Sequence, residues 1–194
     1  DTLNYYAKQL GLGEKTGVEL PGEVAGNLAG PESREANGET WWPGETLQAA
    51  IGQSEQQFTP IQMANYMATI LNGGTRYRPH FLKQVVSYDY TQVVEEYEPE
   101  VLAEMDISES TIEAIKEGMR GVVTDDGTAA SVFRDYPIAV GGKTGSAQTT
   151  ASKSQSAHGV FISFAPYDDP QIAVFVLVEH GGSGGNVAPI VRDI

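Results

Sequence analysis

The sequence contains no cysteine among its 194 residues. This absence excludes disulfide bonds, thiolate metal sites and a cysteine nucleophile. Basic residues are scarce as well, since 12 lysine and arginine residues stand against 26 aspartate and glutamate residues, for a formal net charge of −14. Because so acidic a surface repels phosphate groups, we expect no nucleic-acid partner and no direct docking on an anionic membrane.

Long hydrophobic runs are also lacking. The longest strongly apolar run, Ile172 to Val178, is far too short to span a membrane. The first residues do not have the pattern of a signal peptide. Both termini have helical patterns, so we interpret the chain as a piece of a longer protein. Any export signal or membrane anchor is then expected outside these residues.

Patterns that indicate a metal or a cofactor are missing too. The histidines His80, His158 and His180 are scattered, without the paired spacing of metal ligands. Asp125-Asp126 and Asp168-Asp169 are interpreted as turn acids, since neither begins the alternating acidic pattern of a calcium loop. We therefore expect neither a metal nor an organic cofactor.

Helical patterns dominate the first two thirds of the chain. One helix is predicted over residues 2–10 and ends at Gly11 or Gly13. Another begins at Thr59-Pro60, where a hydroxyl N-cap precedes proline at the first helical position. The stretch from Ser110 to Glu113 has the pattern of a capping box and predicts a further helix directly after it.

The segments between these helices are less regular. Residues 18–53 are rich in Gly, Pro, Asn and Glu, and a long loop is expected there. Residues 81–88 and 91–97 are expected to be extended, around a turn at Asp89. A short helix is predicted from Gly127 through Phe133.

Extended segments dominate the last third. Strands are predicted over residues 138–147, 159–165 and 172–178, with a hairpin loop from Pro166 to Pro170 between the last two. Helices followed by antiparallel strands predict an α+β fold, in which an antiparallel sheet is flanked by helices.

The stretch Gly141 to Thr150, GGKTGSAQTT, first suggests a phosphate-binding loop. Such a loop needs a glycine five positions before its Gly-Lys-Thr, and Pro137 stands there instead. The loop must also lead into a helix, whereas the residues after Ser146 are polar and favour no helix. A nucleotide site is therefore rejected.

A strand at the edge of a cleft is the alternative interpretation of the same stretch. Alternate side chains of a strand share a face, so Lys143 and Gly145 point one way and Thr144 and Ser146 the other. Glycine at 145 leaves room for a ligand against the backbone. The backbone N–H of Ser146 can donate to a developing oxyanion, and the hydroxyl groups can hold a carboxylate. For Lys-Thr-Gly alone, an exposed polar strand end is the favoured interpretation.

Several blocks around this strand carry a family resemblance. Lys143 to Ser146, followed by His158 to Pro166 and the run from Ile172 to Glu179, resembles the third sequence motif and the sheet hairpin of penicillin-binding proteins. Further stretches are similar to other blocks of their transpeptidase domains, in the family's order: Gly11 to Glu23, Ala50 to Gln53 with Phe58 to Ala64, and Gly121 to Ala129. The style is closest to the class B enzymes, the monofunctional transpeptidases of elongation, division or sporulation.

The resemblance implies a serine β-lactamase/penicillin-binding transpeptidase-like fold and acyl transfer on peptidoglycan stem peptides. It implies Lys143 and Ser146 as catalytic residues, and substrate binding by Thr144, Gly145, Ser146 and Gln148. Thr149 is a further candidate contact along the strand. The implied partners are the stem peptide, β-lactams and other cell-wall synthesis proteins. The implied location is the extracytoplasmic face of the bacterial cell membrane, with an anchor outside this chain.

One departure from the family is large. Its nucleophile and base lie in a Ser-x-x-Lys motif followed by Ser-x-Asn, and no serine of this chain fits either pattern. Thr150 to Lys153 has the spacing with threonine, but it follows the lysine strand and is treated as coincidence. Residues 1–194 are therefore expected to be the C-terminal part of a single transpeptidase domain, whose nucleophile lies upstream. The chain alone is expected to form no acyl-enzyme.

Three alternatives are kept beside this interpretation. Gly181 to Gly185 matches the Gly-x-Ser-x-Gly of a hydrolase nucleophile elbow, but no histidine follows Ser183, so a flexible glycine loop is preferred. A β-lactam sensor or a non-catalytic binding module would use the same fold. A serine β-lactamase would share the lysine strand but not the long acidic loop region. The loop from Gln53 to Glu55 is interpreted as structural support.

Overall fold

The structure is a computed structural model that describes residues 2–124, 126–148 and 155–194. Its centre is a three-stranded antiparallel sheet in the order β5-β6-β7, made of β5 (Gly141–Ala147), β6 (His158–Ala165) and β7 (Ile172–Val178). In the register, Lys143 lies opposite Ile162, and Phe161 lies opposite Val176. The predicted strands are confirmed, although the first begins at Gly141 rather than at residue 138.

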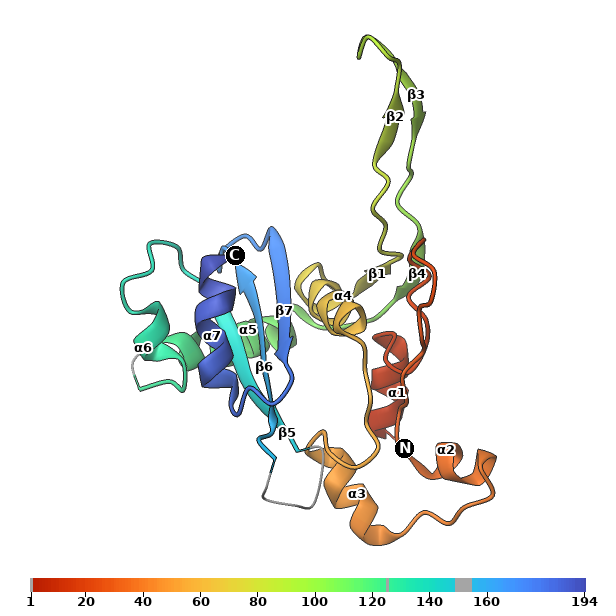
Figure 1. Cartoon of the computed structure of the whole chain (residues 1–194), viewed down its shortest axis with the longest axis vertical. Helices are drawn as coiled ribbons and strands as arrows, with labels where there is room; N and C mark the ends of the chain where they lie inside the picture. Colours follow the sequence, from red (N-terminus) through yellow and green to blue (C-terminus); the bar gives the residue numbers. More distant parts are fainter. Residues whose placement is uncertain (1, 125, 149–154) are drawn as a thin grey trace.

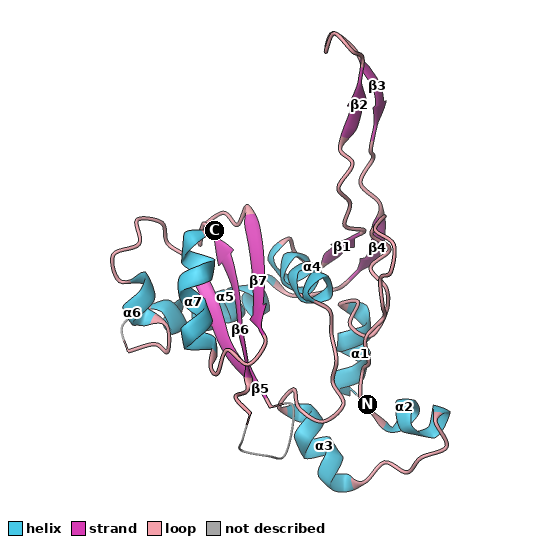
Figure 2. Cartoon of the chain, in the orientation of Figure 1, coloured by secondary structure: helices cyan, strands magenta, loops and turns pink. Residues whose placement is uncertain are grey.

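Helices cover both faces of this sheet (Figures 1 and 2). On one face, Phe161 packs with residues of α6 (Ala130–Phe133) and α7 (Gly184–Asp193). On the other, Ile162 and Phe164 pack against Met67 of α4 (Pro60–Leu71) and Met119 of α5 (Glu109–Val123). Because β6 is central, its apolar side chains point alternately into two hydrophobic clusters, which explains why its sequence is apolar almost without interruption. The predicted α+β class, an antiparallel sheet flanked by helices, is confirmed.

The N-terminal part of the chain contains α1 (Thr2–Gln9) and a stretch with two short helices. These are α2 (Pro31–Ala36) and α3 (Pro43–Ala50), so the prediction of one long loop over residues 18–53 was wrong. Both helices begin with proline, but their N-cap residues are Gly30 and Trp42, which are not the usual side-chain caps. Helices this short, without a side-chain N-cap, have too little apolar periodicity to be predicted from the sequence.

Helix α4 begins as predicted, because the Thr59 hydroxyl accepts a hydrogen bond from the Gln62 N–H (3.3 Å). The start of α5 was predicted two residues too late. Its N-cap is Ser108, whose hydroxyl accepts from the Thr111 N–H (3.2 Å), so Ser110 already lies in the first turn.

Two small antiparallel ribbons complete the described part of the chain. One pairs β1 (Thr75–Tyr77) with β4 (Val101–Glu104), and neither strand was predicted. The other pairs β2 (Gln84–Val86) with β3 (Val93–Glu96), as expected around Asp89 but over fewer residues. This second ribbon projects as a long arm away from the sheet and its helices (Figure 1).

Candidate active site

The site predicted from the sequence is carried by β5, which lies at one edge of the sheet in the described part of the chain. Its strand conformation continues through Ser146 and Ala147, with Ser146 opposite Gly159. A phosphate loop would have turned into a helix at this point. The rejection of a nucleotide site therefore agrees with the structure.

The outer edge of β5 can be identified from three carbonyl groups, in β5 or directly before it, that accept hydrogen bonds from side chains. Arg120 donates to the Val140 carbonyl (2.9 Å), Lys143 Nζ to that of Thr144 (2.6 Å) and Gln53 Nε2 to that of Ser146 (3.2 Å). In a strand, the N–H and C=O of one residue point to the same side, and successive residues alternate. The backbone N–H of Ser146 therefore points to this open edge, away from β6.

Lys143 brings a positive charge to the same edge. Its side chain is exposed, and its ammonium group reaches the carbonyl of the next residue, Thr144, at 2.6 Å. An ammonium group held there can attract a ligand carboxylate or exchange a proton with a neighbouring group. The predicted lysine thus lies beside the predicted backbone donor.

Thr144 faces a cleft of about 330 Å³ between β5 and the start of α7, lined by Thr128, Thr144, Gly145, Ser146, Ser183, Gly184 and Gly185. The hydroxyl groups of Thr128 and Thr144 lie 3.0 Å apart. Four lining residues carry hydroxyl groups and none carries an acid, so the cleft suits a small anionic or hydrogen-bonding group.

Two glycines are needed for this geometry. A Cβ at Gly184 would lie 2.6 Å from the backbone nitrogen of Gly145, so glycine allows the start of α7 to approach β5. A Cβ at Gly145 would lie 2.5 Å from Cγ2 of Val160, so a side chain at this position would force the Val160 side chain to shift. This packing constraint accompanies the ligand-contact role expected for Gly145 from the sequence.

Two predicted substrate contacts, Gln148 and Thr149, remain. Gln148 follows β5 as an exposed residue and does not line the cleft. Thr149 and the stretch from Thr150 to Lys153 lie outside the described residues.

Gln53 and Thr128 are functional candidates that the sequence did not predict as site residues. Gln53 was assigned to structural support, and Thr128 was quoted only as part of a matching block. Both reach β5 from distant positions in the chain, which no local pattern reveals. Their side chains contact Ser146 and Thr144, respectively.

Ser183 does not have the surroundings of a hydrolase nucleophile. It is the N-cap of α7, in ordinary extended backbone with φ −129° and ψ 158°. The nearby histidine rings are bonded elsewhere, because His158 Nδ1 accepts from the His180 N–H (3.0 Å) and His180 Nδ1 lies 3.1 Å from the Ser156 carbonyl. The structure thus agrees with the preference for a glycine loop.

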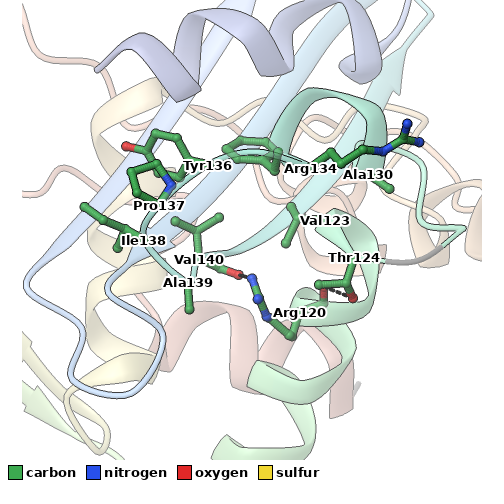
Figure 3. A pocket seen from close by; sticks show the side chains of 11 residues that line it. Arg120, Val123, Thr124, Ala130, Arg134, Tyr136, Pro137, Ile138, Ala139 and Val140 are labelled. Atoms are coloured by element: carbon green, nitrogen blue, oxygen red, sulfur yellow. Dashed lines mark hydrogen bonds between the residues drawn. The ribbon is translucent and has the colours of Figure 1, made fainter.

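A larger cavity, of about 500 Å³, lies at the other end of β5, between α5 and α6 (Figure 3). Its two cationic side chains do not converge: Arg120 donates to the Val140 carbonyl, whereas Arg134 points away from it (Figure 3). These two cationic groups therefore do not share one ligand position. We therefore place the candidate active site at the smaller cleft.

Among the described residues, no helix is long and apolar enough to cross a membrane. Likewise, no three histidine, aspartate or glutamate side chains among them are arranged to hold a metal ion.

Comparisons with known proteins match both the sequence and the fold. The family model of the penicillin-binding protein transpeptidase domain matches residues 1–194. The chain belongs to this family. Among curated relatives, the peptidoglycan D,D-transpeptidase MrdA of Escherichia coli K12 is 32% identical over 210 residues, which cover 100% of this chain and 32% of the relative.

Solved structures of the family have the same fold. Penicillin-binding protein PBP2 of Pseudomonas aeruginosa, in complex with WCK 5153, has a TM-score of 0.81 and 32% identity over 98% of this chain and 42% of that one. PBP2 of Helicobacter pylori, in complex with MreC, has a TM-score of 0.78 and 28% identity over 98% of this chain and 34% of that one. The chain thus spans about a third of the length of the MrdA relative.

Proposed function

We propose that this chain is the substrate-holding part of a D,D-transpeptidase that cross-links peptidoglycan stem peptides and is acylated by β-lactams. The observation that carries the proposal is the open edge of β5, where the Ser146 backbone and the Lys143 ammonium group lie side by side. Family membership supports the reaction class, because the matching model covers the whole chain.

In the proposed reaction, a serine outside residues 1–194 passes its hydroxyl proton to the proton-transfer network and attacks the carbonyl carbon between the two terminal D-alanines. The carbonyl oxygen becomes an oxyanion, and the Ser146 N–H donates a hydrogen bond to it. The C–N bond then breaks, the departing amine takes up the serine's proton, and D-alanine leaves. The amine of a neighbouring stem peptide next attacks the acyl-serine and loses a proton, the ester C–O bond breaks, and the serine oxygen takes that proton as the cross-link forms.

The side chains of β5 have separate roles in this proposal. Lys143 supplies positive charge to the substrate carboxylate and to the proton-transfer network. The hydroxyl groups of Thr144 and Ser146 donate hydrogen bonds to the same carboxylate. Gly145 leaves room for the ligand to lie against the backbone, and Gln148 contacts the substrate further along the strand. A β-lactam follows the same path but stays attached to the serine.

We also propose the setting in which the reaction occurs. Residues 1–194 form the C-terminal part of a single transpeptidase domain, and a segment outside them anchors it at the extracytoplasmic face of the bacterial membrane. The partners are other cell-wall synthesis proteins, a proposal that the complex of Helicobacter pylori PBP2 with MreC supports. The net charge of −14 argues against a nucleic-acid partner.

The experiment is Lys143→Ala in the full-length protein, with the rate of acylation by a fluorescent penicillin as the readout. We expect labelling to be abolished, because the carboxylate and the proton-transfer network lose their cation. Lys83→Ala is the matched control, since Lys83 is also exposed but lies at the base of the β2–β3 arm, and it should be labelled at the wild-type rate. Normal labelling of Lys143→Ala would refute the assignment.

A further inference from the structure

Two hydrogen bonds fix the backbone of the segment that carries Gln53. Its backbone N–H donates to the Gln48 carbonyl (2.9 Å) at the end of α3. Two residues later, the carbonyl of Glu55 accepts from Asn27 Nδ2 (2.8 Å). These backbone contacts do not involve the Gln53 side chain, which is therefore free to reach the Ser146 carbonyl at 3.2 Å.

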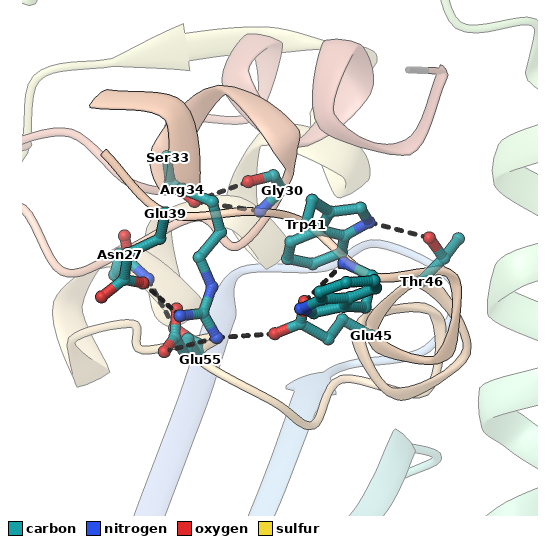
Figure 4. Close-up of polar contacts among 10 residues, drawn as sticks. Asn27, Gly30, Ser33, Arg34, Glu39, Trp41, Glu45, Thr46 and Glu55 are labelled. Atoms are coloured by element: carbon teal, nitrogen blue, oxygen red, sulfur yellow. Dashed lines mark hydrogen bonds and ion pairs between the residues drawn. The ribbon is translucent and has the colours of Figure 1, made fainter. Parts of the chain in front are cut away.

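An arginine fixes the same segment to the rest of the N-terminal region (Figure 4). Arg34 of α2 forms ion pairs with Glu39, with Glu45 (2.6 Å) and with Glu55 (3.0 Å). The hydrogen bond with Glu39 raises the pKa of the Arg34 guanidinium. The loop that presents Gln53 is thus tied to α2 and α3 and does not hang free over the cleft.

The Ser146 carbonyl is the group that an extended ligand would use. A peptide that adds to the edge of a sheet pairs its N–H groups with the outward carbonyls of the edge strand. Ser146 offers an outward carbonyl beside the N–H proposed for the oxyanion. A ligand whose reacting carbonyl sits at that N–H would place a neighbouring amide N–H at this carbonyl.

From this geometry we propose that Gln53 is a specificity-determining residue, whose side-chain amide occupies the Ser146 carbonyl and must be displaced by any ligand that donates an amide N–H to it. The proposal rests on the proposed function, because it concerns the ligands of the same strand. Ligands without such an N–H leave the Gln53 contact in place.

A ligand that displaces the Gln53 amide from the Ser146 carbonyl loses the free energy of that hydrogen bond. The net contribution of one hydrogen bond corresponds to about a three- to tenfold change in an equilibrium or rate constant. Removing the Gln53 donor should therefore favour amide-bearing ligands by about three- to tenfold over ligands that lack the amide.

The test compares two β-lactams on the full-length protein. Benzylpenicillin carries an acylamino N–H beside its reactive ring, whereas imipenem carries a hydroxyethyl group there. We expect Gln53→Ala to raise the ratio of the two second-order acylation rates, benzylpenicillin over imipenem, by about three- to tenfold. Gln53→Met keeps the size of the side chain, adds no charge and cannot donate, so it should raise the ratio similarly.

Gln57→Ala is the matched control. Gln57 lies in the same segment, and among the described residues only its backbone groups are bonded, to Asn27. Its ratio should equal that of the wild type. An unchanged ratio in both Gln53 variants, or an equal loss for both drugs, would overturn the proposal while leaving the proposed function intact. If the wild-type protein reacts with neither drug, the proposed function fails, and this inference fails with it.

Discussion

Ser146 contributes to the proposed site through its backbone as well as its hydroxyl group. Its N–H and C=O both point to the open edge of β5, so neither is used in the ladder with β6. A mutation can therefore remove this N–H without removing a hydrogen bond of the sheet. Proline is tolerated on an edge strand where the missing N–H would face outward.

Ser146→Pro should therefore remove the proposed oxyanion donor without breaking the sheet. We expect the acylation rate of the full-length protein to fall by roughly 10²–10³-fold, the usual effect of losing one such donor. Ser146→Ala keeps the N–H and loses only the hydroxyl, so its rate should fall far less. Stopped-flow acylation with a reporter β-lactam measures both, and equal losses in the two variants would contradict the role of the N–H.

For individual residues, the sequence predicted the features that depend on local spacing along the chain. The alternation along β5 placed Thr144 and Ser146 on one face, and both line the cleft. Gln53 and Thr128 were not predicted as site residues, because their contacts to β5 depend on how distant segments pack. A hydrogen bond between residues 93 positions apart, such as that between Gln53 and Ser146, leaves no periodic pattern in the sequence.

Among the helices and strands, the cleft depends on the close packing of the start of α7 against β5. A Cβ at Gly184 would lie 2.4 Å from the Val160 carbonyl oxygen and 2.6 Å from the Gly145 nitrogen, both of which are backbone atoms. At Gly185 the nearest atom would be the Thr128 carbonyl oxygen, at 3.6 Å, an ordinary contact. Two neighbouring glycines of one helix thus differ sharply in what they tolerate.

Gly184→Ala should force α7 away from β5 and lower the free energy of unfolding by about 1–3 kcal/mol, as overpacking does. Gly185→Ala should leave it unchanged or raise it slightly, because alanine favours a helix. Chemical denaturation of both variants gives the comparison. Equal stability of the two would show that the start of α7 does not pack against β5 as described.

Elements with strong signals were predicted, and weakly marked ones were not. Helix α4 has a hydroxyl N-cap and proline, and it was found at its start. The short helices α2 and α3 begin after Gly30 and Trp42, and β1 has only three residues, which leaves little pattern to detect. Their formation depends on tertiary contacts such as the ion pairs of Arg34.

For the whole molecule, the order of the matching blocks predicted the family, and the family model confirms it over residues 1–194. The β2–β3 arm projects from the sheet and helices, and its Tyr88 side chain is fully exposed. The 194 residues contain neither Ser-x-x-Lys nor Ser-x-Asn. We therefore propose that the nucleophile lies in a segment outside these residues, and we expect both parts to be needed for acylation.

The most direct measurement is labelling by a fluorescent penicillin of two proteins, the full-length protein and residues 1–194 alone. We predict covalent label on the full-length protein only, suppressed by prior incubation with unlabelled penicillin. Peptide mapping should then place the adduct on a serine outside residues 1–194. Label on residues 1–194 alone would contradict the assignment of the nucleophile, and Ser183 would then be mutated first. Absence of label from both would contradict the proposed transpeptidase and favour a non-catalytic relative.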